Sequence, residues 1–349
     1  TRVGASSAST SATAAATRSD PGGVNSSAPE RRQQLLRISL QAVVADLSGG
    51  SHTAADLPGG AWLVDGATLW VRLDDAPHRA LGAAIAIALR EEVDRVEVLV
   101  GDPDPAPLVA RRASQWSLPI SVRGLDGRSP FPVEPVFHRA PPTVPDSHLD
   151  LVETIVAAGA EPVVAHGVLT AQYRGLEIAK VVDDDGAPRL DVGVGVNDRE
   201  AFRELHVGEA PEASLARVVE AVSAHRVDGA RPHPFNTMSP EGYLAWRLRD
   251  DPSALGVGSL VTTPGAVAPV GAVDPGPVMM LGGGRLFACT TGFDLGALPD
   301  ALDAREAAVV AGEIDDSSLT VVVPASNRLP VLDRMASVAA AEVRVVEVP

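Results

Sequence analysis

The stretch YRGLEIAKVVDDDGAPRLDVGVGVNDREAFRELH, residues 173–206, decides how the middle of this chain folds. Apolar residues alternate on both sides of an acidic turn at residues 183–188, and this spacing predicts two paired strands. One face of the second strand is entirely aliphatic, as in a buried face, whereas Asp191 and two glycines share the other face. Asp198 precedes a helical pattern and is a suitable N-cap. The stretch therefore predicts a β-hairpin followed by a capped helix.

A helix and a further strand precede this hairpin. Asp146 stands where an N-cap is expected, apolar residues follow at helical spacing, and Gly159 marks the end of the helix. Residues 162–172 predict one long strand that leads into the hairpin. The middle of the chain therefore reads helix, strand, strand, strand, helix.

The segments before and after the middle repeat one pattern. Over residues 60–123, two strands joined by an Asp-Gly turn precede a helix, a strand, a helix and a strand. Over residues 271–348 the same order recurs, and LDRMAS (332–337) precedes the last strand as VARRAS (109–114) does in the first segment. We therefore predict an α/β fold, with α+β as the alternative class, in which two similar ββαβαβ blocks flank a middle αβββα segment. The repeated order indicates an internal duplication.

Composition divides the chain further. The residues before position 32 are mostly Ser, Thr, Ala and Gly, which bury too little apolar surface to offset the entropy of ordering them. A proline-rich stretch separates the first block from the middle segment. The predicted parts are a disordered tail at 1–31, an N-terminal α/β block at 32–126, a linker at 127–146, the middle segment at 147–250 and a C-terminal α/β block at 251–349.

Charge and cysteine content restrict the possible functions. The 349 residues carry a formal net charge of −16 at pH 7, which argues against broad binding to nucleic acids or anionic membranes. The single cysteine, Cys289, excludes an internal disulfide and a cysteine-rich zinc site. No apolar run approaches the length of a membrane span and no secretory leader is recognisable. We therefore expect an acidic cytoplasmic protein without a membrane segment.

The element order and the acidic residues of the middle segment resemble, over residues 147–206, the core of restriction-endonuclease-like (PD-(D/E)XK) nucleases. In such a core, an acid on the second strand and an acid-x-Lys motif on the third bind a divalent metal that activates water. The resemblance implies Glu177 as the first acid, Asp191 as the second, and Glu153 on the preceding helix as an auxiliary acid.

The lysine of the nuclease motif is missing from this sequence. Gly193 stands where the motif has lysine. Lys180 does not replace it, because on a regular strand it faces away from Glu177. Arg199 or Arg203 on the following helix could supply the positive charge instead. The alternative interpretation is that the two acids are ordinary solvated positions of a hairpin.

Histidines are the other candidates for metal ligands. His206, His225 and His233 lie in the same region as Asp198, and a set of imidazoles with a carboxylate suits a transition metal. Their spacing matches no compact motif such as H-E-x-x-H. Roles at helix ends or on the surface are therefore the preferred interpretation.

Two functions follow from the sequence. The first is a non-catalytic α/β binding or scaffold protein for an unidentified protein partner or ligand, without a cofactor. The missing lysine, the acidic charge and the absence of phosphate-binding loop motifs favour it. The alternative is a divalent-metal-dependent phosphodiesterase or nuclease that uses Glu177 and Asp191 with Mg²⁺ or Mn²⁺.

Overall fold

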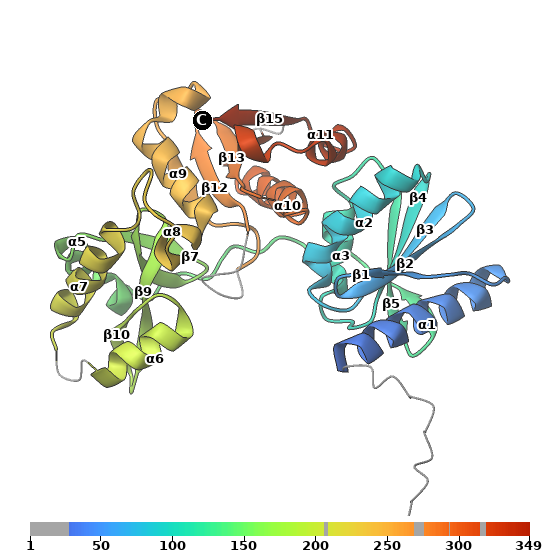
Figure 1. The fold of residues 1–349 in the computed structure, drawn as a ribbon, viewed down its shortest axis with the longest axis horizontal. Helices are drawn as coiled ribbons and strands as arrows, with labels where there is room; N and C mark the ends of the chain where they lie inside the picture. Colours follow the sequence, from blue (N-terminus) through green and yellow to red (C-terminus); the bar gives the residue numbers. More distant parts are fainter. Residues whose placement is uncertain (1–27, 206–208, 269–275, 293, 315–318) are drawn as a thin grey trace, which may run out of the picture.

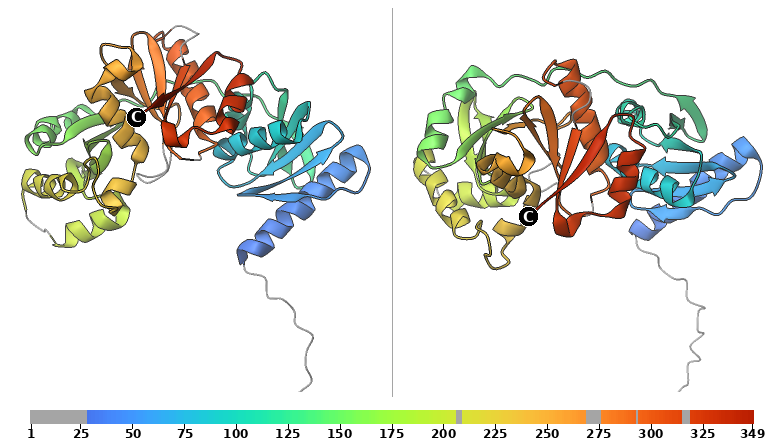
Figure 2. Two further views of the ribbon diagram at one scale, coloured as in Figure 1. Left: turned by 45° about the horizontal axis from the view of Figure 1, so that its top comes forward. Right: turned by 90° about the horizontal axis from the view of Figure 1, so that it is seen from above.

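Three sheets, one in each predicted part, form the framework of the chain (Figure 1). The computed structural model describes residues 28–205, 209–268, 276–292, 294–314 and 319–349. Helices accompany the sheet in each part, so the predicted α/β class is confirmed. The C-terminal block lies between the N-terminal block and the middle segment (Figures 1 and 2). Within the described ranges, none of the helices combines the length and the hydropathy that a membrane crossing requires.

The N-terminal block is a six-stranded sheet with helices on both faces. Its elements are α1 (Ala28–Ser48), β1 (Ala55–Leu57), β2 (Gly60–Asp65), β3 (Thr68–Leu73), α2 (Pro77–Glu91), β4 (Arg95–Val100), α3 (Ala106–Ala113), β5 (Ile120–Asp126) and β6 (Ser129–Pro132). The strands follow one another in the sheet in sequence order. β3, β4 and β5 run parallel, and the other neighbours pair antiparallel. Helices α2 and α3 pack on one face, and α1 covers the other through a separate apolar cluster.

The C-terminal block repeats this arrangement. Its elements are α9 (Pro240–Asp250), the 3₁₀ turn η1 (Pro252–Leu255), β11 (Val261–Thr263), β12 (Val278–Gly282), β13 (Arg285–Cys289), α10 (Ala297–Val310), β14 (Leu319–Pro324), the 3₁₀ turn η2 (Ala325–Asn327), α11 (Pro330–Ser337) and β15 (Val343–Val348). The strands again lie in sequence order, with β13, β14 and β15 parallel and the earlier pairs antiparallel. The predicted ββαβαβ order therefore recurs in both blocks. Each block also begins with a helix on the opposite face of its sheet, α1 in the first and α9 in the second.

The middle segment contains four strands, not the three expected from the sequence. Its elements are α4 (Asp146–Leu149), α5 (Val152–Ala157), β7 (Glu161–Ala165), β8 (Val168–Tyr173), β9 (Leu176–Asp184), β10 (Ala187–Val192), α6 (Gly195–Leu205), α7 (Pro211–Ser223) and α8 (Pro234–Thr237). The strands form an antiparallel meander, and α5 and α7 pack on one face of it. The expected long strand over 162–172 is a hairpin, because His166 and Gly167 adopt φ values of 50° and 78°. Two consecutive positive φ angles make a tight turn, and His-Gly is not one of the dipeptides that usually announce it.

Three predicted boundaries shift in the structure. Helix α1 begins at Ala28, and the rest of the predicted disordered tail, residues 1–27, lies outside the described residues. Strand β6 arises from the proline-rich linker and extends the N-terminal sheet. Helix α9, which the sequence placed in the middle segment, packs into the C-terminal block, where Leu244 and Leu248 share a cluster with Phe287. These boundaries are set by packing between segments that are distant in the chain. The local sequence therefore does not reveal them.

The two outer blocks share one hydrophobic core. Leu81 of α2 and Leu302 of α10 are fully buried in the same cluster, which continues into both sheets. The helices approach so closely that a Cβ added to Gly82 would lie 1.8 Å from the carbonyl oxygen of Leu295. The position therefore requires glycine, because any larger residue would force α2 away from the start of α10.

Equivalent segments of the two blocks meet at this interface. Trp116 follows α3, Ala339 follows α11, and the two residues form an antiparallel β-bridge. The Ser117 N–H donates a hydrogen bond of 2.8 Å to the carbonyl oxygen of Val338 beside the bridge. Two similar units related by a two-fold axis contact each other through equivalent segments that run in opposite directions.

A buried ion cluster joins α3 to α10 across the same interface. Asp303 is fully buried, and its carboxylate accepts hydrogen bonds of 2.7 and 2.9 Å from Arg111 and of 3.1 Å from Arg112. Arg112 also contacts the carboxylate of Asp300, one turn earlier on α10. Charges removed from water are tolerated only when they are paired in this way.

We predict that Asp303→Asn lowers the free energy of unfolding by about 3 kcal/mol or more, because the buried Arg111 loses its counter-charge and Arg112 keeps only Asp300. Urea unfolding followed by circular dichroism measures the change. The control is Glu342→Gln, since the Glu342–Arg344 pair has side chains 56% and 70% exposed. That variant should differ from the wild type by less than about 1 kcal/mol. Equal effects of the two substitutions would contradict the importance of the buried cluster.

Candidate functional site

A β-bulge brings the two predicted acids to one face of the middle sheet. Lys180 pairs with Asp191 on one side and with Thr170 on the other, whereas Glu177 pairs with Gln172. Thr170 and Gln172 share a face because they are two residues apart on β8. The register shift between β8 and β9 places one extra residue in β9, so Glu177 and Lys180 also share that face. The expectation that Lys180 faces away from Glu177 is therefore wrong, since it assumed a regular strand.

Arginine side chains already contact both acids. The guanidinium of Arg199 on α6 contacts the Glu177 carboxylate, and their side chains are 5% and 25% exposed. Arg199 also donates a hydrogen bond of 3.1 Å to the carbonyl oxygen of Gly193. The carboxylate of Asp191 lies 3.5 Å from the guanidinium of Arg189. Arg199 therefore supplies positive charge beside Glu177, which is one of the two possibilities that the sequence suggested. It neutralises the Glu177 carboxylate in an ion pair and does not face an open site.

Glu153 does not join these two acids. It is exposed on α5, and Ile155 of that helix packs into the cluster on the opposite face of the sheet, together with Ala179 and Val192. Ala179 and Val192 pair with each other on the face away from Lys180 and Asp191. The sheet therefore separates Glu153 from Glu177, and the three predicted site residues do not converge.

The two described histidines of this region, His225 and His233, form no metal-ligand group with Asp198. The carboxylate of Asp198 accepts a hydrogen bond of 2.7 Å from the Val194 N–H, and His206 lies outside the described residues. His225 and His233 stack with ring centroids 3.6 Å apart. Nδ1 of His233 accepts the Phe235 N–H at 3.2 Å, which caps the short helix α8. These contacts are the helix-end roles that the sequence favoured.

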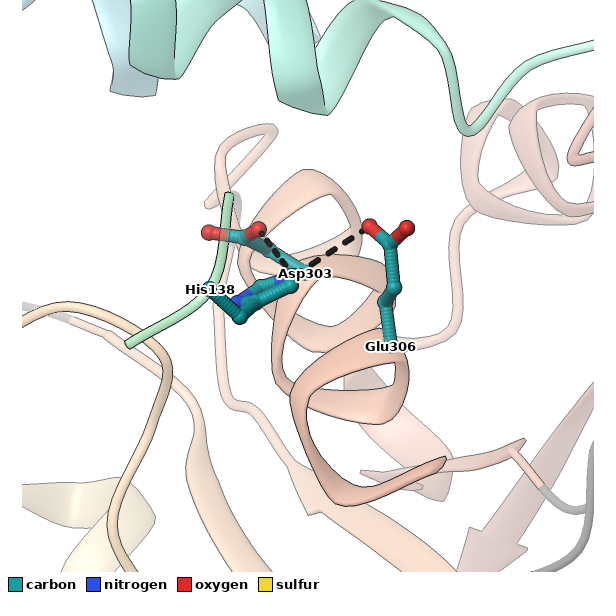
Figure 3. A group of neighbouring side chains, drawn as sticks. All are labelled: His138, Asp303 and Glu306. Atoms are coloured by element: carbon teal, nitrogen blue, oxygen red, sulfur yellow. Dashed lines mark hydrogen bonds and ion pairs between the residues drawn. The ribbon is translucent and has the colours of Figure 1, made fainter. Parts of the chain in front are cut away.

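His138, Asp303 and Glu306 form a second cluster of metal-ligand types. Figure 3 shows His138 reaching from the linker to two carboxylates on α10. Nε2 of His138 lies 3.2 Å from Glu306 and 3.5 Å from Asp303, and the three ligand atoms lie within 4.8 Å of one another. A cation there would stand beside the guanidinium groups that Asp303 binds, Arg111 and Arg112. The cluster is therefore better suited to fasten the linker onto α10 than to hold a metal.

A cavity of about 280 Å³ lies where the three parts of the chain meet, and we call it the central cavity. The N-terminal block contributes the first turn of α2 and the last turn of α3, and the middle segment contributes β7 and the β8–β9 turn. The C-terminal block contributes α9, the residues around β11 and the start of α10. The charged and apolar groups in its wall include His78, Arg112, Val164, Glu177, Arg249 and Asp300.

Two titratable groups in this wall are strongly perturbed. Burial, together with the nearby Arg112 and Arg79, lowers the pKa of His78 to about 4, so the imidazole is neutral at pH 7. Burial raises the pKa of Asp300 to about 6, although Arg112 lowers it. Perturbed groups in a concave site are a physical indication of binding or chemistry.

Among the candidate site residues whose side chains the structure describes, Glu177 is the one that lines this cavity. His78 and Asp300 are 222 positions apart in the chain, and neither belongs to a recognisable motif. The repeated block order was the one sequence signal that could have pointed to these residues. Helices α2 and α10 occupy the same place in the two blocks, and each supplies its first turn to the cavity wall.

We predict that Mn²⁺ does not raise the melting temperature of the wild type, because the carboxylates of Glu177 and Asp191 are already paired with arginines. Thermal melts with and without millimolar Mn²⁺ check this. A metal-dependent rise that disappears in both Glu177→Ala and Asp191→Ala would contradict it and would support the phosphodiesterase.

We also predict that Glu177→Ala lowers the free energy of unfolding by about 1–3 kcal/mol, because the buried guanidinium of Arg199 loses its charged partner. Glu153→Ala is the control, since this exposed carboxylate should change stability by less than about 0.5 kcal/mol. Denaturant titration of both variants measures the difference. A neutral Glu177→Ala would show that Arg199 is satisfied without it.

The low pKa of His78 predicts a pH-dependent stability. The pKa lies near 4 in the folded chain against 6.5 ordinarily, so the unfolded chain binds a proton more readily than the folded one. The contribution of neutral His78 to stability is therefore complete above pH 6.5 and is lost as the pH falls toward 4. His78→Asn should reduce the drop in melting temperature between these pH values. An unchanged drop would contradict the prediction.

Comparison with known proteins assigns no family to this chain. No protein-family model, no curated protein and no solved structure matches it. What the protein does must therefore be inferred from its own residues.

Proposed function

We propose that this chain is a small-molecule-binding α/β protein whose ligand occupies the central cavity. The observation that carries the proposal is that residues from all three parts of the chain line this one cavity. Ligand sites in proteins are concave, occur preferentially where domains meet, and are usually preformed. The volume of about 280 Å³ lies near the lower end of the range for such sites, which suits a ligand of metabolite size.

The composition of the cavity wall supports the same proposal. Apolar side chains such as Val163, Val278 and Met279 can contact the body of a ligand, while Gln172 and Glu177 offer polar groups. The wall combines apolar and polar groups, and in ligand sites the apolar groups give affinity while the polar groups fix the orientation of the ligand. In this proposal the middle segment serves as one wall of a binding site and does not act as a nuclease.

A metal-dependent phosphodiesterase is the second candidate, because Glu177, Lys180 and Asp191 share one face of the middle sheet. That face would offer two carboxylates and a lysine to a metal and a phosphodiester. Two contacts weigh against it, namely the Glu177–Arg199 pair and the Asp191–Arg189 pair. Asp191 also does not line the central cavity.

We predict that Val164→Trp abolishes ligand binding without destabilising the fold. Val164 lines the central cavity and is 48% exposed, so a larger side chain can fill the cavity without entering the core. Val168→Trp is the matched control, because this residue belongs to the same hairpin and is 37% exposed but does not line the cavity. A library of metabolite-sized compounds, screened by melting-temperature shift on the three proteins, should give compounds that lose their shift only in Val164→Trp. Ligands that stabilise all three proteins equally would refute the central cavity as the site.

A further inference from the structure

The charged side chains in the wall of the central cavity already have partners within the protein. The contacts are Arg79–Asp294, Arg112–Asp300, Arg249–Glu161, Glu177–Arg199 and Glu241–Thr291. Burial lowers the pKa of both histidines of the wall, His78 and His166, so neither is charged at pH 7. A charged ligand would have to displace one of these partners. The wall therefore selects for no net charge, and its uncharged polar groups must recognise the ligand.

The edge of strand β7 supplies such groups. Val163, Val164 and Ala165 all line the cavity. Successive side chains of a strand point to opposite faces of the sheet, so a cavity above one face would contact only alternate residues. Three consecutive lining residues show that the cavity lies against the edge of β7. This edge is open, because β7 ends the middle sheet and pairs with β8 alone.

The hairpin geometry gives the direction of the backbone groups of β7. Ala165 pairs with Val168 around the two-residue turn His166–Gly167, and the residues that flank such a turn are joined by hydrogen bonds. Hydrogen-bonded and non-hydrogen-bonded pairs alternate along antiparallel strands. The N–H and C=O of Val164 therefore point away from β8, toward the cavity. Within the described part of the chain, they form no backbone hydrogen bond to a residue outside the sheet.

A second open strand edge borders the same cavity. Strand β11 ends the C-terminal sheet and pairs with β12 alone. Consecutive residues again line the cavity, from Thr262 in β11 to Ala268 in the segment that follows it. The cavity therefore lies between the edges of two different sheets.

The edge strands that do not border the cavity are protected against further pairing. Each contains proline or charged side chains, namely Asp56 in β1, Pro130 and Pro132 in β6, Pro188 and Arg189 in β10, and Arg344 and Glu347 in β15. Such residues are the usual means by which proteins block edge pairing. In contrast, residues 163–165 of β7 and residues 261–263 of β11 include neither proline nor charge. The edges that remain able to pair are those at the cavity.

We infer that the ligand of the central cavity is a short free peptide in extended conformation, which binds by adding a strand to the edge of β7. This inference rests on the proposed function and names the class of its ligand. A peptide backbone carries N–H and C=O groups at the spacing that a strand edge requires, and main-chain hydrogen bonds give the affinity in this mode of binding. The apolar side chains of Val278 and Met279 in the same wall can contact those of the peptide.

The open edge limits the length of the peptide. The edge at residues 163–165 is three residues long, and a strand advances about 3.4 Å for each residue. A peptide of about three residues therefore matches it, and this size agrees with a cavity of about 280 Å³.

A library of tripeptides tests the inference. The peptides are blocked by an N-terminal acetyl group and a C-terminal methylamide, and they are built from Ala, Val, Ser, Glu and Lys. Each is titrated into the full chain and followed by ligand-observed NMR, with Val164→Trp identifying binding in the central cavity. Every peptide that binds is then compared with its N-methylated analogue, which has the same side chains and charge but cannot donate backbone hydrogen bonds. We expect N-methylation to weaken binding by about tenfold or more.

Val164→Pro tests the same contact from the side of the protein. Proline removes the N–H that points to the cavity and is tolerated at an edge position whose N–H is not used in the sheet. This variant should bind the tripeptides roughly fivefold or more weakly than the wild type. Val164→Thr is the matched control, because it keeps the N–H and the branched shape, and it should bind as the wild type does. Melting curves check that both variants are folded, and the N-methylated peptides give the answer on the unaltered protein.

Two results would overturn the inference. N-methylated peptides that bind as tightly as their parents would exclude strand addition. Absence of binding by all of the blocked tripeptides would exclude a peptide as the ligand. The compound screen with Val164→Trp tests the cavity independently of both results, so a failure of the peptide inference is distinguished from a failure of the proposed function.

Discussion

The relative position of the two outer blocks depends on the ion pairs that the buried carboxylate of Asp303 forms. It binds Arg111 and Arg112 of α3 and faces His138 of the linker, so one side chain connects three segments of the chain. Arg111 and Asp303 are separated by 192 residues in sequence. An apolar interface alone would permit small shifts of one helix along the other. A buried charge permits only the arrangement in which it is paired, because the alternatives leave it without a partner in a medium of low dielectric constant.

The two blocks are similar in topology but use different chemistry at their interface. When VARRAS is aligned with LDRMAS, Arg112 of α3 corresponds to Met335 of α11. Met335 is buried in the shared apolar core. Arg334, aligned with Arg111, instead donates to the carbonyl oxygen of Leu89 at the end of α2. An internal duplication would produce the shared strand order. Because the two blocks contribute different side chains to the interface, they can pack in one arrangement only. In the exchanged arrangement the arginines would be buried against apolar side chains.

The middle segment is anchored to the C-terminal block by backbone contacts around a second buried arginine. Arg226 is 1% exposed and donates hydrogen bonds of 2.8 to 2.9 Å to four carbonyl groups, those of Arg174, Phe235, Met238 and Ser239. Burial lowers its pKa to about 10, so it remains charged at pH 7. These bonds join the β8–β9 turn to the start of α9. Both segments line the central cavity. The hydrogen bonds of Arg226 therefore also hold this part of the wall of the proposed binding site in place.

The sequence by itself determined the elements that depend on local patterns. Alternation and helical spacing predicted the ββαβαβ order of both blocks, and the Asp65-Gly66 turn predicted the first hairpin, because each signal acts within a few residues. Tertiary structure alone decided that β9 carries a bulge, that Glu177 pairs with Arg199, and that His78 and Asp300 line one cavity. The physical reason is that these features arise from contacts between segments far apart in the chain. Local periodicity sets which way a side chain points on its own strand or helix, but the partner that satisfies its charge is chosen only when the three parts pack together.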